Sequence, residues 1–287
     1  VISILKECEE PLFIIVSAFG GITNLLQKCI VSKGKSVNGI INQIEHRHLE
    51  VIDNLSSLDK QSSLKSFLKQ TLNELEDILD AISTIDEVTD KTISKVLTLG
   101  EILSSSIIYE ILKQKGFDIS YVDSRELIFT KDFNNGQILD SNKTSISIKD
   151  KIGLIKSKLV IASGYICSNE KGETSNLGRG GSDYSAAIYA KYLNAKVLEI
   201  WTDVSGVFSA NPKIVKKASP IEFLSYKEAM ELSFFGAKVI YFPTLQPLIE
   251  DNIPVFIKNT FEPSAEGTCI SNSTKLDNDE IVKGISH

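Results

Sequence analysis

Residues 11–23 have the sequence Pro-Leu-Phe-Ile-Ile-Val-Ser-Ala-Phe-Gly-Gly-Ile-Thr. The run from Leu12 to Val16 is apolar and rich in β-branched residues, which predicts a buried strand, and it leads into a pair of glycines. Adjacent glycines let backbone N–H groups approach an anion closely, and the hydroxyls of Ser17 and Thr23 add donors. We therefore expect either a loop that binds phosphate or carboxylate, or a plain turn between a strand and a helix.

Outward from this stretch, predicted strands and helices alternate. Residues 40–112 are mostly helical in pattern, since apolar side chains recur at helical spacing between residues 64 and 82. Further strands are expected at 117–122, 158–161, 195–201 and 254–258, and further helices at 1–8, 92–114, 183–193, 225–235 and 237–251. This alternation predicts an α/β fold with a mainly parallel sheet covered on both faces. We expect two lobes that share the sheet and divide near residue 195, with ligands beyond the carboxyl ends of the strands.

The composition is that of an ordinary globular protein. The 287 residues are 42% hydrophobic and 24% charged, with a net charge of −6. No basic excess points to nucleic acid, so an anionic ligand must be held by a local site. No apolar run is long enough to span a membrane, and no leader resembles a signal peptide. We therefore expect no nucleic-acid or membrane partner.

The cysteines and histidines predict neither disulfides nor a metal site. The four cysteines are scattered with no C-x-x-C pair, so we expect reduced thiols and a cytoplasmic protein. His46 and His48 point apart on a helix, and we expect both at the surface. With His287 they make no metal site.

A second glycine-rich loop spans residues 172–183, Gly-Glu-Thr-Ser-Asn-Leu-Gly-Arg-Gly-Gly-Ser-Asp, and leads into a predicted helix. Backbone amides and the helix dipole favour an anion there, and Arg179 can grip a carboxylate through two parallel hydrogen bonds. Asp183 either holds an ammonium group or caps the helix. Neither glycine loop matches the G-x-x-x-x-G-K-[ST] pattern of a P-loop kinase.

Three other positions could carry chemistry. Glu101 follows Gly100 in a largely apolar helical stretch, where a buried carboxylate needs a partner such as an amino group, unless it lies at the surface. Residues 201–213 form a strand end and a Gly/Pro-rich loop, suited either to an adenine pocket or to an ordinary connection. Lys238 follows a glycine at a predicted helix start, where it is either a ligand-binding residue or a solvated lysine.

Taken together, these segments resemble the aspartate kinases of the amino-acid kinase family. The resemblance rests on seven strings in the family's order, spanning nearly the whole chain: V-S-A-F-G-G-I-T-N (16–24), L-G-E (99–101), V-D-S-R (122–125), S-N-E-K-G-E-T (168–174), L-G-R-G-G-S-D-Y (177–184), I-W-T-D (200–203) and F-G-A-K-V (235–239). It implies a three-layer α/β/α sandwich with a mainly parallel sheet. It also implies phosphoryl transfer from Mg-ATP to the side-chain carboxylate of L-aspartate, giving 4-phospho-L-aspartate, in lysine, threonine and methionine biosynthesis.

The resemblance also implies roles for individual residues. The catalytic set is Ser17, Gly20, Gly21, Asp183 and Lys238. The aspartate site is Thr23, Glu101, Tyr165, Arg179, Ser182 and Asp183. The nucleotide site is Thr202, Asp203, Phe208, Lys213 and Lys238. The cofactors implied are ATP and Mg²⁺, with no metal bound directly by a protein cluster, and a homodimer is expected for the full-length protein.

Several positions depart from the family pattern. Tyr165 stands where the family has Phe. Phe208 replaces a Tyr and so lacks its hydroxyl, and Lys213 replaces an Arg and so lacks its forked donor. The family's opening strand with its lysine loop is expected before Val1, and regulatory ACT domains after the chain, so we expect the chain from Val1 alone to be nearly inactive.

The expected organisation is an aspartate-binding lobe (1–194) and a nucleotide-binding lobe (195–287). Two alternatives stay open: a kinase of the same fold acting on glutamate, acetylglutamate or a nucleotide, and a non-catalytic binding domain. A homoserine dehydrogenase fused downstream stays open as well.

Overall fold

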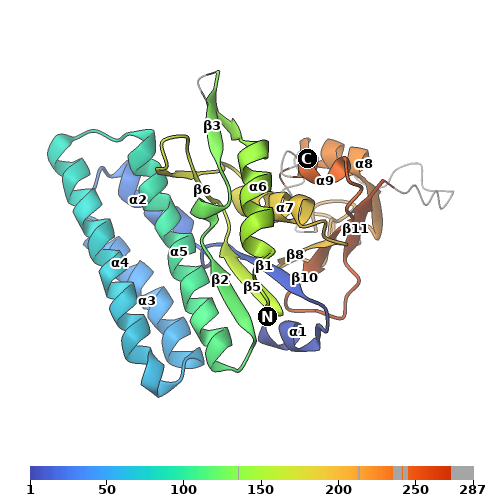
Figure 1. The fold of residues 1–287 in the computed structure, drawn as a ribbon, viewed down its shortest axis with the longest axis horizontal. Coiled ribbons are helices and arrows are strands. Elements are labelled where there is room, and N and C mark those ends of the chain that lie inside the picture. The colour runs from blue at the N-terminus through green and yellow to red at the C-terminus, as the bar shows by residue number, and fades with distance from the viewer. Residues whose placement is uncertain (135, 213, 235–240, 242–244, 273–287) are drawn as a thin grey trace. The chain divides into compact units, whose positions relative to one another are not determined.

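The computed structural model describes residues 1–134, 136–212, 214–234, 241 and 245–272 (Figure 1). These residues form two compact units. The first unit is Glu10–Gly178, and the second joins Val1–Glu9 to the described residues from Arg179 onward. The predicted boundary between residues 194 and 195 lies inside the second unit, because the helix at Gly181–Tyr192 packs against other elements of that unit.

The first unit contains a three-stranded parallel sheet. Strand β5 (Leu159–Ser163) lies in the centre, with β1 (Leu12–Val16) on one side and β2 (Ile119–Val122) on the other. The register pairs Val16 with Ser163, so the strands end at the same edge of the sheet. Since β1 leads into the first glycine loop, that loop lies at the carboxyl edge, where α/β sheets place their ligands.

Helices make up most of the first unit. They are α2 (Ile22–Val31), α3 (Asn38–Leu55), α4 (Leu58–Ile85), α5 (Asp90–Gln114) and α6 (Ser141–Ile152). Helix α5 contacts all three strands, and α2, α3 and α4 pack with α5 and with one another (Figure 1). Thr89 caps the start of α5, and Gly116, at φ +83°, follows its end, as expected for the predicted stop at this glycine.

Two hairpins and a short helical turn complete the first unit. One hairpin pairs β3 (Thr130–Phe133) with β4 (Gly136–Leu139), and the other pairs β6 (Ile166–Ser168) with β7 (Thr174–Asn176). The turn η1 (Ser124–Glu126) follows β2. These short elements, together with α6, were not among the predicted strands and helices.

The second unit has a four-stranded sheet of its own, in the order β8-β10-β11-β9. Strands β8 (Leu198–Thr202) and β10 (Val255–Asn259) are parallel, β11 (Thr268–Ser271) runs antiparallel to β10, and β9 (Phe223–Ser225) is parallel to β11. The helices of this unit are α1 (Ile2–Glu7), α7 (Gly181–Tyr192), α8 (Tyr226–Phe234) and α9 (Gln246–Ile249). Buried aliphatic side chains from α7, α9 and the strands form its core.

The predicted α/β class with a mainly parallel sheet is confirmed. The expectation of one sheet shared by both lobes differs from the structure, in which each unit has its own hydrogen-bonded sheet. Of the helix predicted at 237–251, the described part contains α9, while residues 237–240 and 242–244 lie outside the described residues.

Candidate functional site

The first glycine loop joins β1 to α2. Gly21 is the N-cap of α2 at φ +86°, and no side chain caps the helix. A Cβ built on Gly20 or Gly21 meets no atom within 4 Å, so the space beside this backbone is open. Since the N–H groups of a first helical turn have no partner within the helix, and the dipole favours negative charge there, the loop is suited to an anion. Ser17 and Thr23, at its two ends, are both exposed.

Helix α5 lies directly against this loop because of Gly100. A Cβ at Gly100 would stand 3.0 Å from the Cβ of Ala18 and 3.2 Å from Cγ2 of Ile22. Even an alanine there would require these neighbours to shift by a few tenths of an ångström. This close approach places the next residue, Glu101, beneath the loop.

Glu101 is almost completely buried, with 4% of its surface exposed. Its carboxylate accepts a hydrogen bond from the backbone N–H of Ala18, and its Oε2 atom is buried without a hydrogen-bond partner. Burial raises the pKa of Glu101 to about 7, although its own backbone N–H and that of Ala18 act in the opposite direction. A buried carboxylate with an unused oxygen is suited to a cationic group. Of the two alternatives for Glu101, the structure therefore favours a buried carboxylate that binds an amino group over a surface residue.

Serine hydroxyls on the same helix fix the loop and Glu101. Ser104 Oγ donates to the carbonyl of Ser17 (2.8 Å) and lies 3.2 Å from the carbonyl of Glu101. Ser105 Oγ donates to that same carbonyl over 2.7 Å. The backbone of the loop is thus hydrogen-bonded to side chains of α5 at its first two residues, Ser17 and Ala18.

Tyr165 lies at the same edge of the first unit, between β5 and β6. It has φ +67°, which is rare and costly for an aromatic residue and is found most often at functional sites. Its backbone carbonyl accepts from the N–H of Leu177 (2.9 Å). Burial, followed by the charge of nearby Glu101, raises the pKa of the Tyr165 hydroxyl. The first unit therefore gathers the glycine loop, Glu101 and Tyr165.

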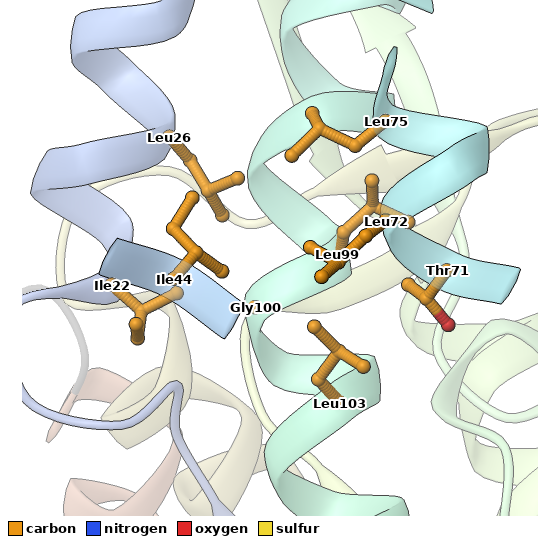
Figure 2. A pocket seen from close by; sticks show the side chains of 9 residues that line it. All are labelled: Ile22, Leu26, Ile44, Thr71, Leu72, Leu75, Leu99, Gly100 and Leu103. Atoms are coloured by element: carbon orange, nitrogen blue, oxygen red, sulfur yellow. The ribbon is translucent and has the colours of Figure 1, made fainter. Parts of the chain in front are cut away.

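Below the loop lies a small apolar pocket rather than a polar site. Figure 2 shows its lining on both sides of Gly100: Ile22, Leu26, Ile44, Thr71, Leu72, Leu75, Leu99, Gly100 and Leu103. The one hydroxyl among them, on Thr71, is used by the carbonyl of Phe67 (3.0 Å). We interpret this pocket as core packing that supports the loop from beneath.

The second glycine loop begins α7. Gly178 and Gly180 adopt φ +75° and +66°, and Gly180 is the N-cap of α7, which has no side-chain cap. The alternative in which Asp183 caps the helix is therefore wrong, because Asp183 lies in the first turn without a capping hydrogen bond. Burial raises the pKa of its carboxyl to about 6.

Arg179 and Ser182 flank this turn. Arg179 is exposed, and its guanidinium has no ion pair among the described residues. Ser182 is partly buried beside Asp183. The loop thus presents a cation, a hydroxyl, a partly buried carboxylate and helix N-terminal amides within five residues.

The loop after β8 is closed by side chains from β11. Val207 N–H donates to Thr268 Oγ1 (2.8 Å), which donates to the carbonyl of Ile221 (2.6 Å). Gly206, at φ +114°, is needed because a Cβ there would lie 2.4 Å from Thr268 Oγ1. Phe208 forms an isolated bridge with Pro220.

Thr202 and Asp203 stand at the start of this loop, where Thr202 Oγ1 donates to Asp203 Oδ1 (3.1 Å). Lys213 and Lys238, predicted for the nucleotide site, lie outside the described residues. Trp201, which directly precedes Thr202, donates from Nε1 to Glu199 (3.1 Å). The ammonium group of Lys258 lies 5.2 Å from the centre of the Trp201 ring. Lys258 also pairs with Glu199 at 2.9 Å.

The structure describes all four cysteines, and two of them are buried. All four cysteines are free thiols, and burial raises the pKa of Cys29 and Cys167 to about 11. Within the described ranges, no group of three or more His, Cys, Asp or Glu side chains is placed to hold a metal ion. Nor does any helix in that part of the chain have the length and apolar character to cross a membrane.

The surface prediction for His48 is wrong. His46 is exposed as expected, but His48 is fully buried, because it continues the buried stripe of α3 formed by Ile41, Ile44 and Ile52. Gly100 and Ser104 were also not predicted to support the site. An isolated glycine inside a helical pattern is a signal of close approach, whereas nothing near Ser104 in the sequence points to the carbonyl of Ser17.

A parallel α/β sheet with glycine loops leading into helix N-termini defines a class of proteins that bind phosphate-containing ligands. The chain belongs to the amino acid kinase family, whose family model matches residues 1–259.

Relatives in this family include aspartokinases. The chain is 32% identical to the aspartokinase of Chlamydia pneumoniae over 91% of this chain, and 35% identical to a bifunctional aspartokinase/homoserine dehydrogenase of Haemophilus influenzae over 97%. It spans only 57% and 35% of the lengths of these two relatives. The crystal structure of Escherichia coli aspartokinase III in complex with aspartate and ADP matches 95% of this chain and 60% of that protein, with a TM-score of 0.85 and 28% identity. The predicted amino-acid kinase α/β fold is thereby confirmed.

Proposed function

We propose that the protein transfers the terminal phosphoryl group of ATP to the side-chain carboxylate of L-aspartate, giving 4-phospho-L-aspartate. The observation that carries this proposal is Glu101, a buried carboxylate with an unpartnered Oε2 beneath an open glycine loop. An amino-acid substrate supplies the ammonium group that such a carboxylate needs. The E. coli relative crystallised with aspartate and ADP supports the same assignment.

In this proposal, charge complementarity binds the aspartate. Arg179, without an ion pair among the described residues, takes a substrate carboxylate through a forked pair of hydrogen bonds. Glu101 and Asp183 take the ammonium group. Thr23 and Ser182 supply hydroxyls, and Tyr165 bounds the site in place of the family's Phe.

The chemistry needs no general base, because the attacking carboxylate is ionised at neutral pH. Ser17, Gly20 and Gly21 line the path of the phosphoryl group, where backbone amides at a helix N-terminus stabilise the charge that spreads over its oxygens. Thr202, Asp203, Phe208 and Lys213 serve the nucleotide, and Lys238 both nucleotide and phosphoryl group. Catalysis is then positioning plus electrostatic stabilisation.

Mg²⁺ is proposed to arrive with ATP. Magnesium keeps several of its waters and is commonly bound by one or two carboxylates together with substrate phosphates. The phosphates of ATP would hold the ion, and Asp183 stays with the ammonium group of the substrate. When bound, the ion neutralises phosphate charge.

The wider setting is also part of the proposal. The reaction would be the first step of lysine, threonine and methionine biosynthesis, in the cytoplasm, by a homodimer of the full-length protein. The aspartate lobe would be residues 1–194 and the nucleotide lobe 195–287, although the contacts between elements divide the chain after Gly178.

The test is a hydroxylamine trap. We expect the full-length protein with ATP, Mg²⁺ and L-aspartate to form aspartyl hydroxamate, and Arg179→Ala to abolish it. Arg47→Ala is the matched control, since Arg47 is an exposed arginine of α3 that pairs, among the described residues, with Glu50 at 3.3 Å. Hydroxamate from glutamate but not aspartate would contradict the assignment and favour another acceptor, and hydroxamate from neither would favour a non-catalytic domain.

A further inference from the structure

The buried face of α3 contains one polar side chain among aliphatic ones. Its buried residues are Ile41, Ile44, His48 and Ile52, at the spacing of a single helix face. His48 has no exposed surface. A histidine in such a stripe calls for an explanation, because an aliphatic residue would fill the position without burying nitrogen atoms.

The hydrogen bonding of His48 defines its state. Nδ1 lies 2.7 Å from the carbonyl oxygen of Ile44, and a carbonyl can only accept, so Nδ1 carries the proton. Nε2 is then an acceptor, and it is buried without a partner. Leaving a buried acceptor unpaired costs folding free energy, so the histidine is not explained by stability.

The ring of His48 contacts the first glycine loop. Its centre lies 5.1 Å from the centre of the Phe19 ring, with 39° between the ring planes, which is the range of favourable aromatic pairs. Phe19 lies in the loop directly before Gly20, and its carbonyl accepts from the N–H of Ile22 (2.9 Å). The other two attachments of the loop, at Ser17 and Ala18, come from α5, so His48 supplies the attachment from α3.

We infer that His48 is a positioning residue, whose ring holds Phe19 and thereby fixes the Gly20-Gly21 backbone for the phosphoryl group. The inference rests on the proposed function for what the loop binds. The contact by which the His48 ring holds Phe19 in place does not depend on the proposed function. The two α5 attachments act before the glycines, whereas Phe19 adjoins them directly, so its ring controls where their amides point.

Three variants of the full-length protein separate this role from general packing. His48→Leu removes the ring and the unpaired nitrogen. His48→Phe keeps a ring against Phe19. His46→Leu is the matched control, since His46 is an exposed histidine on the same helix, whose ring lies 3.5 Å from Glu50. Each is measured for kcat, for thermal midpoint and for hydrogen exchange of the amides in residues 17–24, at a temperature where all are folded.

We expect His48→Leu to lower kcat about tenfold, since small misplacement of a catalytic group is costly, and to speed exchange of the loop amides. Its thermal midpoint is expected to be no lower than that of the parent, because a buried unpaired acceptor is gone. His48→Phe is expected to restore kcat to within about twofold, since the aromatic pair is kept, and His46→Leu to behave as the parent.

Two results would overturn the inference. The first is that His48→Leu has the kcat and the loop exchange rates of the parent. The second is that kcat and the thermal midpoint fall together in both His48→Leu and His48→Phe. If the parent forms no aspartyl hydroxamate, the proposed function fails instead, and the exchange rates still decide whether His48 braces the loop.

Discussion

Each of the two glycine loops leads into a helix N-terminus with a carboxylate close by, but the two carboxylates come from different parts of the chain. In each, a glycine with positive φ is the N-cap of a helix without a side-chain cap: Gly21 for α2 and Gly180 for α7. In each, a carboxylate with a raised pKa accompanies the open helix N-terminus. Asp183 lies in the first turn of its own helix, whereas Glu101 comes from α5, eighty residues along the chain from its loop.

This difference has a physical consequence. A carboxylate in the first turn of a helix is placed by local geometry, and the helix dipole stabilises its charge. A carboxylate from another helix depends on the packing that brings it there, which here is the contact at Gly100. We expect the second loop to tolerate changes in distant packing, and the first loop to be sensitive to them.

The largest expected effect tests whether both carboxylates bind the substrate. Glu101→Gln and Asp183→Asn each remove a charge opposite the proposed ammonium group, and losing one member of a buried charge pair commonly costs 2–5 kcal/mol. We expect kcat/KM for aspartate to fall about a hundredfold in each. A change below threefold in either variant would remove that residue from the aspartate site.

The second prediction concerns stability and pH. The folded pKa of Glu101, about 7, is above its ordinary value of 4.5, so the folded protein binds a proton that the unfolded chain has lost, and stability falls as pH rises between these values. The interval corresponds to about 3 kcal/mol. We therefore expect Glu101→Gln to be more stable than the parent at pH 8, by up to this amount, and nearly equal to it at pH 4.

Asp183→Asn sharpens this comparison. Because the pKa of Asp183 rises only to about 6, its stability advantage is expected to level off near pH 6, while that of Glu101→Gln still grows toward pH 7. Chemical unfolding across this pH series measures both. Identical pH profiles for the two variants would show that the two carboxylates do not differ in this way.

The third prediction breaks the contact that places Glu101. In Gly100→Ala the new Cβ stands 3.0 Å from Ala18 and 3.3 Å from Leu26 Cδ1, and overpacking of this kind costs about 1–3 kcal/mol. Gly39→Ala is the matched control, a helical glycine whose Cβ meets no atom within 4 Å. It is expected to stabilise the protein by up to about 1 kcal/mol. Thermal unfolding of the pair gives the difference, and equal effects would argue against close packing at Gly100.

The smallest expected effect comes from the loop backbone. Gly21→Ala adds no clash but places a side chain at φ +86°, which costs about 1 kcal/mol. Gly20→Ala meets the same open space without a positive φ, so its stability is expected to stay within about 0.5 kcal/mol of the parent. A larger loss in Gly20→Ala than in Gly21→Ala would contradict this description of the loop.

The sequence predicted local features well and distant contacts poorly. The strand before Gly20, the stop of α5 at Gly116 and the helix after Gly180 follow from residue patterns within a few positions. The short hairpins were missed because strands of three or four residues carry little periodicity. The spacing of His46 and His48 does not predict the burial of His48, whereas its place in the stripe of Ile41, Ile44 and Ile52 does.

For the candidate site too, local features could be predicted from the sequence and contacts between distant residues could not. Glu101 was a candidate from its apolar surroundings, but its position beneath the loop depends on α5 packing against β1 and α2, which no local pattern contains. The pattern predicts Asp183 near a helix start, whereas the structure shows that it lies in the first turn and not at the N-cap, two positions that differ by only a few residues.

Trp201 offers a spectroscopic consequence. It is the only tryptophan in the chain, and it lies in β8 of the second unit, next to Thr202 and Asp203 and between Glu199 and Lys258. Its fluorescence therefore reports on the second unit alone, while the long helices α4 and α5 of the first unit contribute much of the circular dichroism. Followed together during unfolding, the two signals tell whether the units melt as one or in sequence, and the proposed binding of nucleotide at Thr202 and Asp203 can be tested without any added label.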